Sequence, residues 1–156
     1  MKRFATLALL MVAPALVVIA ADVKPAGLDG TYKVTGLTKG GKVTPPEDVA
    51  KIFEGATIKG DKFTMKIAGE NKTATIKVDA KAKPATIDIT ADEGPEKGKT
   101  MKAIYKLEKG VLTIAVTEDK SGDAKRPENF DGKGDDDILL EFTKEENKED
   151  KKKDDK

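Results

Sequence analysis

The feature of this chain that most constrains its fold is a series of short runs of alternating apolar and polar residues, joined by very short connections. Alternation places apolar side chains on one face of an extended chain, which indicates half-buried β-strands. The connections at 59–61, 69–71 and 109–110 each supply a residue that tolerates positive φ. Turns this short join antiparallel neighbours, because parallel neighbours need a crossover of a dozen residues or more. The sequence therefore predicts an all-β antiparallel meander.

About eight such runs are present, and each offers one apolar face. Closing the sheet into a barrel buries that face and leaves no exposed edge, so we expect a barrel, with a two-sheet sandwich as the alternative. One stretch, 45–53, departs from the alternation: Val49, Ile52 and Phe53 stand at helical spacing, which predicts a short helix packed over an end or edge of the sheet. The expected strands are 31–37, 56–59, 62–68, 72–79, 85–90, 101–108, 111–117 and 137–143.

The N-terminus has the pattern of an export signal. Lys2 and Arg3 precede an apolar run over 5–21 that ends in small residues, which is the three-part arrangement of a secretory signal peptide. We expect cleavage after Ala20 or Ala21. An uncleaved membrane anchor is the alternative, but about 17 residues is the lower limit for spanning the bilayer.

These patterns divide the chain into four parts: a signal peptide over 1–21, a linker over 22–27, a barrel domain over 28–143, and a tail over 144–156. The tail contains only Lys, Glu, Asp and Asn, a composition typical of a disordered, solvated segment. We expect no membrane anchor after cleavage, and a periplasmic or extracellular location.

Charge and composition exclude several classes of function. Loss of Lys2 and Arg3 changes the formal net charge from +1 to −1, so no basic excess indicates nucleic-acid binding. The sequence has no His and no Cys, which excludes Ser-His and Cys-His catalysis, the usual zinc sites, disulfides and a lipoprotein anchor. We therefore expect a protein without enzymatic activity and without a cofactor.

Carboxylates are the remaining chemical material. Glu93 and Glu96 flank a loop, and paired acids can hydrolyse glycosides, but 28 acids in 156 residues make chance proximity common. The acidic stretch 131–137 invites a calcium site, yet its spacing does not match an EF-hand loop and Lys133 interrupts it. The segment 94–100 ends like a phosphate-binding loop, but three residues rather than four separate its glycines and a strand follows. Polar connections between strands are the preferred interpretation of all three.

One set of segments stands out in the sequence: 28–34, 93–100, 104–107, 110–112 and 126–130. Together these segments resemble an uncharacterised family of secreted lipocalin-like domains expanded in planctomycete bacteria. The resemblance implies a lipocalin-like barrel and an exported protein, and it implies no established biochemical function. One departure is Tyr32, which stands where such domains usually carry Trp.

Arg126 is the only arginine that remains after the signal peptide. An Arg commonly packs across the first-strand aromatic in lipocalin-like barrels, so the resemblance implies that Arg126 lies over or near Tyr32. Contact with a ligand anion and an exposed loop position are the alternatives.

Two functions remain open. The barrel can enclose a small apolar or amphipathic ligand, or it can be filled by its own side chains and serve as a structural or protein-interaction domain of the cell envelope, whose partner the sequence does not identify. For the ligand-binding hypothesis, the expected lining residues are Tyr32, Met65, Ile76, Tyr105, Ile114 and Arg126.

Overall fold

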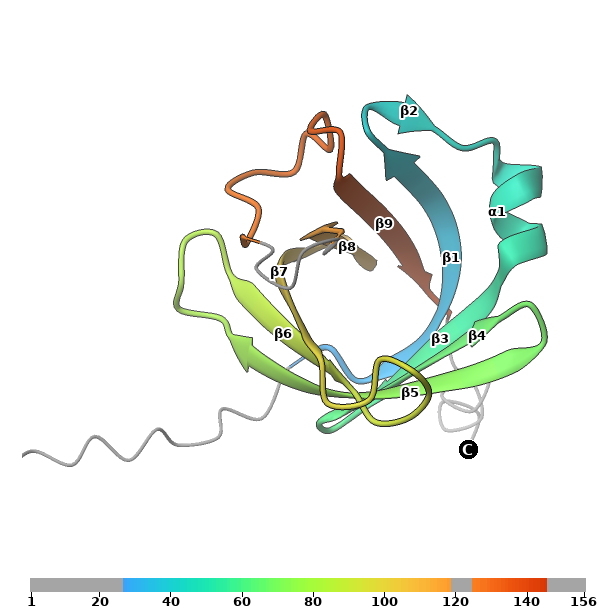
Figure 1. The fold of residues 1–156 in the computed structure, drawn as a ribbon, viewed down its shortest axis with the longest axis horizontal. Helices are drawn as coiled ribbons and strands as arrows, with labels where there is room; N and C mark the ends of the chain where they lie inside the picture. Colours follow the sequence, from blue (N-terminus) through green and yellow to red (C-terminus); the bar gives the residue numbers. More distant parts are fainter. Residues whose placement is uncertain (1–26, 119–124, 146–156) are drawn as a thin grey trace, which may run out of the picture.

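The computed structural model describes residues 27–118 and 125–145, which form one antiparallel β-barrel. Successive strands pair with each other around the sheet, and β1 also pairs with β9, which closes eight strands into a barrel (Figure 1). The predicted barrel is thus confirmed, with β2 as an additional short strand. The elements are β1 (Gly30–Lys39), β2 (Lys42–Val43), α1 (Pro46–Ile52), β3 (Phe53–Lys59), β4 (Lys62–Ile67), β5 (Glu70–Asp79), β6 (Thr86–Ala91), β7 (Thr100–Glu108), β8 (Val111–Thr117) and β9 (Asp137–Lys144).

The closing pair β1–β9 runs from Tyr32 opposite Lys144 to Lys39 opposite Ile138. Its register shifts at Gly36, where β1 bulges. A Cβ at Gly36 would lie 2.5 Å from a carboxylate oxygen of Glu141, so this position of the closing seam has room only for glycine unless Glu141 moves.

Three of the hairpins have turns of two residues with positive φ at both, and the first, Gly40 and Gly41 (φ 55° and 73°), connects β1 to β2. Ala68 and Gly69 (φ 49° and 83°) connect β4 to β5, and Lys109 and Gly110 (φ 51° and 80°) connect β7 to β8. Such turns match the twist of the strands that they join. The turn predicted at 69–71 therefore lies slightly earlier, and Glu70 already belongs to β5.

The predicted helix is present, but its apolar stripe is shorter than expected. Val49 is buried, whereas Ile52 is 40% exposed at the end of α1. Phe53 is not helical, because it opens β3 and pairs with Ile67 of β4. The helix contacts β1 and β3 at one end of the barrel (Figure 1).

One stretch of the barrel is buried on its outer face as well. Ile104, which interrupts the alternation of β7, is 1% exposed. Its cross-strand neighbour Ala115 is 3% exposed. The segment 125–136 lies along this outer face: Pro127 shares a groove with Ile104, and Phe130 lies beneath the Lys106 ammonium, 5.3 Å from the ring centre. Ile104 breaks the alternation because this segment covers it.

The end of the barrel at which β1 begins is closed by side chains. Leu28 and Tyr32 are each 1% exposed, and the Tyr32 hydroxyl donates a 2.7 Å hydrogen bond to the Leu28 carbonyl. Burial is the main reason why the pKa of Tyr32 lies above its ordinary value, and the nearby charge of Asp29 adds to it. The Lys144 ammonium lies 6.0 Å from the centre of the Tyr32 ring. We refer to this end as the closed end.

The first two residues of the predicted tail, Lys144 and Glu145, belong to the barrel. Lys144 ends β9 and donates its N–H to the Gly110 carbonyl, and Glu145 donates to the Thr31 carbonyl, both at 2.8 Å. The predicted signal peptide, the linker up to residue 26 and the rest of the tail lie outside the described residues. Within 27–118 and 125–145, no helix has the length and apolar character needed to cross a membrane.

Candidate functional site

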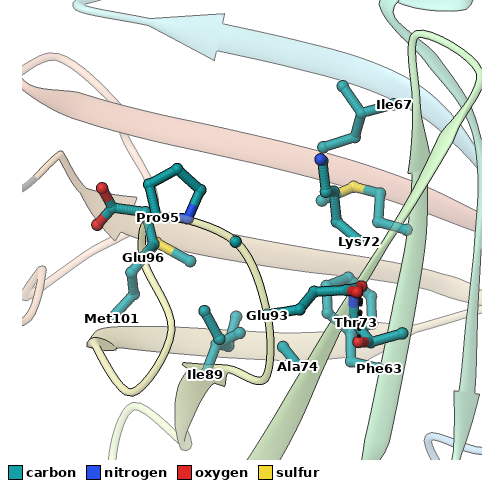
Figure 2. A pocket seen from close by; sticks show the side chains of 13 residues that line it. Phe63, Ile67, Lys72, Thr73, Ala74, Ile89, Glu93, Pro95, Glu96 and Met101 are labelled. Carbon is teal, nitrogen blue, oxygen red and sulfur yellow. Dashed lines mark hydrogen bonds between the residues drawn. The ribbon is translucent and has the colours of Figure 1, made fainter.

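A pocket of about 320 Å³ occupies the opposite end of the barrel, where β4 and β6 end and β5 and β7 begin. We refer to this end as the open end. Apolar side chains from four strands make most of its wall, with a few polar groups at the rim (Figure 2). The lining residues are Phe63, Met65, Ile67, Lys72, Thr73, Ala74, Ile89, Ala91, Glu93, Gly94, Pro95, Glu96 and Met101.

Strand alternation explains why these side chains meet. Phe63, Met65 and Ile67 are every second residue of β4, so they share the inner face of the barrel. Phe63 is buried and packs edge-on against Phe142, with ring centres 6.2 Å apart and planes at 80°. Met65 and Ile67, nearer the open end, are only half-buried. Phe63 therefore forms the floor of the pocket, below which the barrel is packed.

The loop between β6 and β7, residues 92–99, makes one wall of the pocket. It is held by its own backbone: the Gly98 N–H donates to the Ala91 carbonyl at 2.8 Å, and the Ala91 N–H donates to the Lys99 carbonyl at 3.0 Å. Inside the loop, the Lys97 N–H donates to the Gly94 carbonyl at 3.1 Å. These hydrogen bonds within the loop and to its flanking strands fix the shape of the wall.

Two acids attach this loop to β5. The Asp92 N–H donates to the Thr73 carbonyl, and Glu93 Oε1 accepts hydrogen bonds from the Thr73 N–H at 3.0 Å and from its hydroxyl at 2.8 Å. Asp92 also accepts from the Thr75 hydroxyl at 2.7 Å and pairs with Lys62 at 3.1 Å. The hydrogen bond from Thr75 is the main reason why the pKa of Asp92 lies below its ordinary value, and Lys62 lowers it further.

Lys72 supplies the cation of the rim, and it already has a partner. Its ammonium lies 2.5 Å from a Glu70 carboxylate oxygen, and this hydrogen bond is the first cause that raises the pKa of Lys72 and lowers that of Glu70. Glu96, across the pocket, pairs with Lys99 at 2.8 Å. Figure 2 shows Lys72 beside Ile67 on one side of the pocket, with Pro95 and Glu96 on the other.

Among the six residues expected to line a ligand, Met65 is the one that the structure places in this pocket. Four others are buried in the interior of the barrel and contribute to its packing: Tyr32, Ile76, Tyr105 and Ile114. Burial raises the pKa of the Tyr105 phenol, and the charge of Asp79 adds to the shift.

Arg126 lies outside the barrel, and the expectation that it covers Tyr32 is wrong. Its guanidinium donates to the carbonyls of Ala103 at 2.5 Å and Ile87 at 3.4 Å, and it pairs with Asp88 at 2.6 Å. These partners belong to β6 and β7, whereas Tyr32 is on β1 across the barrel. Arg126 therefore fixes the segment 125–136 to the outer face, and the cation near Tyr32 is that of Lys144.

The sequence did not identify most of the pocket. Six further apolar residues share the inner face of the barrel with the expected residues, so alternation alone could have assigned them to that face. They are Phe63, Ile67, Ala74, Ile89, Ala91 and Met101. Alternation does not show at which end of the strands the barrel interior stays unfilled, and this information was missing. The loop that forms the wall coincides with the segment 93–100 of the family resemblance, which was a usable signal.

The acidic stretch 131–137 spans the end of the segment 125–136 and the start of β9, and two of its carboxylates accept hydrogen bonds from its own backbone. Asp131 accepts from the Lys133 N–H at 3.3 Å, and Asp137 accepts from the Gly134 N–H at 3.0 Å. Over the described parts of the chain, no three His, Cys, Asp or Glu residues are grouped closely enough to hold a metal ion.

Comparisons of the chain with protein-family models, with curated proteins and with solved structures gave no match.

Proposed function

We propose that this protein is an exported, non-enzymatic barrel that binds a small apolar or amphipathic molecule in the pocket at its open end. The observation that carries the proposal is the pocket itself: about 320 Å³, walled by apolar side chains of four strands and rimmed by a few polar groups. Binding sites for small molecules have this composition and begin at about this size.

The wall of the pocket supports binding because it is already in place. The loop 92–99 is fixed by its own hydrogen bonds and by the contacts of Asp92 and Glu93 with β5. A ligand then spends little of its binding free energy on ordering the protein. Burial of half-exposed Met65 and of Met101, which is 46% exposed, would add apolar stabilisation.

The export part of the proposal rests on the sequence pattern of residues 1–21. The closed eight-stranded barrel is also the architecture that the resemblance to secreted lipocalin-like domains implies, which supports membership of that family. The absence of His and Cys supports a binding role over a catalytic one.

Native mass spectrometry of the protein produced from the full precursor tests both parts. We expect a chain that begins at Ala21 or Asp22, carrying an added mass that disappears on denaturation. Retention of residues 1–21 would contradict the export proposal. A bare chain that also fails to bind added 1-octanol would contradict ligand binding and favour the structural or protein-interaction alternative.

A matched pair of variants locates the ligand. Ala91→Phe places a ring in the pocket and should abolish the added mass, whereas Ala50→Phe, on the exposed side of α1, should retain it. Ala74→Phe fills the pocket from β5 and serves as a second blocking variant. Circular dichroism confirms that each variant folds. A ligand retained by both folded blocking variants would place it elsewhere.

A further inference from the structure

The charged residues at the rim of the pocket favour one kind of ligand head group over others. This inference rests on the proposed binding function. Three charged residues line the pocket: Lys72, Glu93 and Glu96. Lys72 is paired with Glu70, and Glu96 with Lys99. The remaining charge is the carboxylate of Glu93.

Hydrogen bonds to one carboxylate oxygen hold Glu93 in one orientation. Both of its hydrogen bonds, from the Thr73 N–H and hydroxyl, go to Oε1. Within the described ranges 27–118 and 125–145, Oε2 accepts no hydrogen bond. Figure 2 shows Glu93 lying against Thr73 at the edge of the pocket. A ligand with its apolar part in the pocket can thus meet a positioned acceptor with negative charge.

We propose that the ligand is a short amphipathic amine, whose protonated nitrogen binds Glu93 Oε2 while its apolar part fills the pocket above Phe63. A primary alkylamine is protonated at neutral pH, as a lysine side chain is. Ammonium and carboxylate groups form charge-assisted hydrogen bonds that are stronger than neutral ones.

An anionic head group is disfavoured by the same charges. A carboxylate ligand would have to displace Glu70 from Lys72, a contact of 2.5 Å. Glu93 lines the same pocket, so an arriving anion would face the negative charges of Glu70 and Glu93 together. Like charges repel each other. The apolar part of a fatty acid is the same as that of an amine of equal length, so it offers no extra binding free energy to offset the repulsion.

The pocket also limits the length of the ligand. A volume of about 320 Å³ equals roughly ten groups the size of a water molecule, at about 30 Å³ each. Phe63 and Phe142 close the floor, so a longer chain cannot extend into the barrel. An alkyl chain of about eight carbons or a single substituted ring fits, and a long-chain lipid does not.

Titration calorimetry with three probes of equal chain length tests the proposal: octylamine, 1-octanol and octanoate. We expect octylamine to bind about fivefold more tightly than octanol, and octanoate to bind most weakly. The preference for the amine should decrease at 1 M salt, because the pair is at the rim and is screened.

Glu93→Gln isolates the charge, because its side-chain carbonyl can still accept from Thr73. It should equalise octylamine and octanol binding, and the ratio of the two affinities is the readout. Glu128→Gln removes an exposed acid of the outer segment and should keep the amine preference. Equal binding of octylamine and octanol to the wild type, or tightest binding of octanoate, would overturn the inference and leave the proposed function intact. Failure of all three probes would overturn the proposed function itself.

Discussion

Apolar residues line both ends of the barrel, yet one end is filled and the other holds a pocket. At the closed end, Tyr32 and Leu28 fill the opening and are joined by a hydrogen bond. At the open end, Met65 and Ile67 are half-buried and Met101 is 46% exposed around an unfilled space.

The difference shows how one small barrel can combine a packed core with a binding site. Side chains below Phe63 provide the stability, while the part above it has apolar walls without side chains to fill it. The hydrogen bonds of the loop 92–99 hold one wall of the open end. Stability and binding are therefore expected to respond separately to substitution.

The largest effect should come from truncating the same residue type at the two ends. Ile58 of β3 is 1% exposed, and Ile58→Ala should cost about 2–5 kcal/mol of unfolding free energy, because it leaves a cavity in a packed region. Half-buried Ile67 borders the pocket, and Ile67→Ala should cost less than about 1 kcal/mol but weaken octanol binding. Urea unfolding measures the loss of unfolding free energy in both variants. Similar losses in the two variants would contradict the difference between a packed closed end and an unfilled open end.

The next effect tests how the closed end is sealed. Tyr32→Phe removes the donor to the Leu28 carbonyl and leaves that acceptor without its partner in a buried site. We expect a loss of about 1–3 kcal/mol in unfolding free energy, with ligand binding unchanged. Wild-type stability in this variant would mean that the hydrogen bond does not seal the end.

A smaller effect tests whether the barrel is also stabilised from outside. Arg126→Lys cannot reproduce bonds to Ala103, Ile87 and Asp88 together, so we expect a loss of about 1–2 kcal/mol by thermal unfolding. Lys125→Arg, at an exposed neighbouring position, should change stability by less than about 0.5 kcal/mol. Octanol affinity should stay the same, since Arg126 is outside the pocket; a weaker affinity would show that the two regions are coupled.

The smallest effect concerns the open end and depends on pH. The pKa of Asp92 is lowered in the folded protein, so its carboxylate stabilises the fold above the ordinary value of 3.8 and this stabilisation is lost as the pH falls through the lowered pKa. Asp92→Asn should therefore lower Tm at pH 7, and the difference from the wild type should close below pH 3.8. A difference that persists at low pH would indicate that the charge of Asp92 is not its cause.

The sequence was sufficient for the architecture, and the reasons are local. Alternation and two-residue turns such as Lys109–Gly110 determine strand pairing without reference to distant residues. Burial of Ile104 could not be predicted, because it depends on a segment more than twenty residues later in the chain. Arg126 was misplaced for the same reason, since its partners, two backbone carbonyls and the carboxylate of Asp88, all lie more than twenty residues earlier in the chain.

The candidate site was only partly predictable. Met65 was correctly placed on the inner face, but so were Ile76 and Ile114, which are packed. Which inner positions stay unfilled depends on the volumes of residues that meet from several strands, such as Ala74 and Ala91, which pair across β5 and β6, and Met101 of β7. Neither the periodicity nor the composition of the sequence gives the combined volume of the side chains that meet inside the barrel.

The most direct test uses the methionine methyl groups. The sequence has four methionines, at positions 1, 11, 65 and 101, so a protein cleaved after Ala20 or Ala21 keeps only Met65 and Met101, and both line the pocket. With ¹³C-methyl methionine and isoleucine labels, octylamine should shift both methionine signals and leave those of Ile58 and Ile114, in the packed interior, in place. Unchanged methionine signals at saturating probe, or shifts confined to the packed isoleucines, would contradict a binding site at the open end.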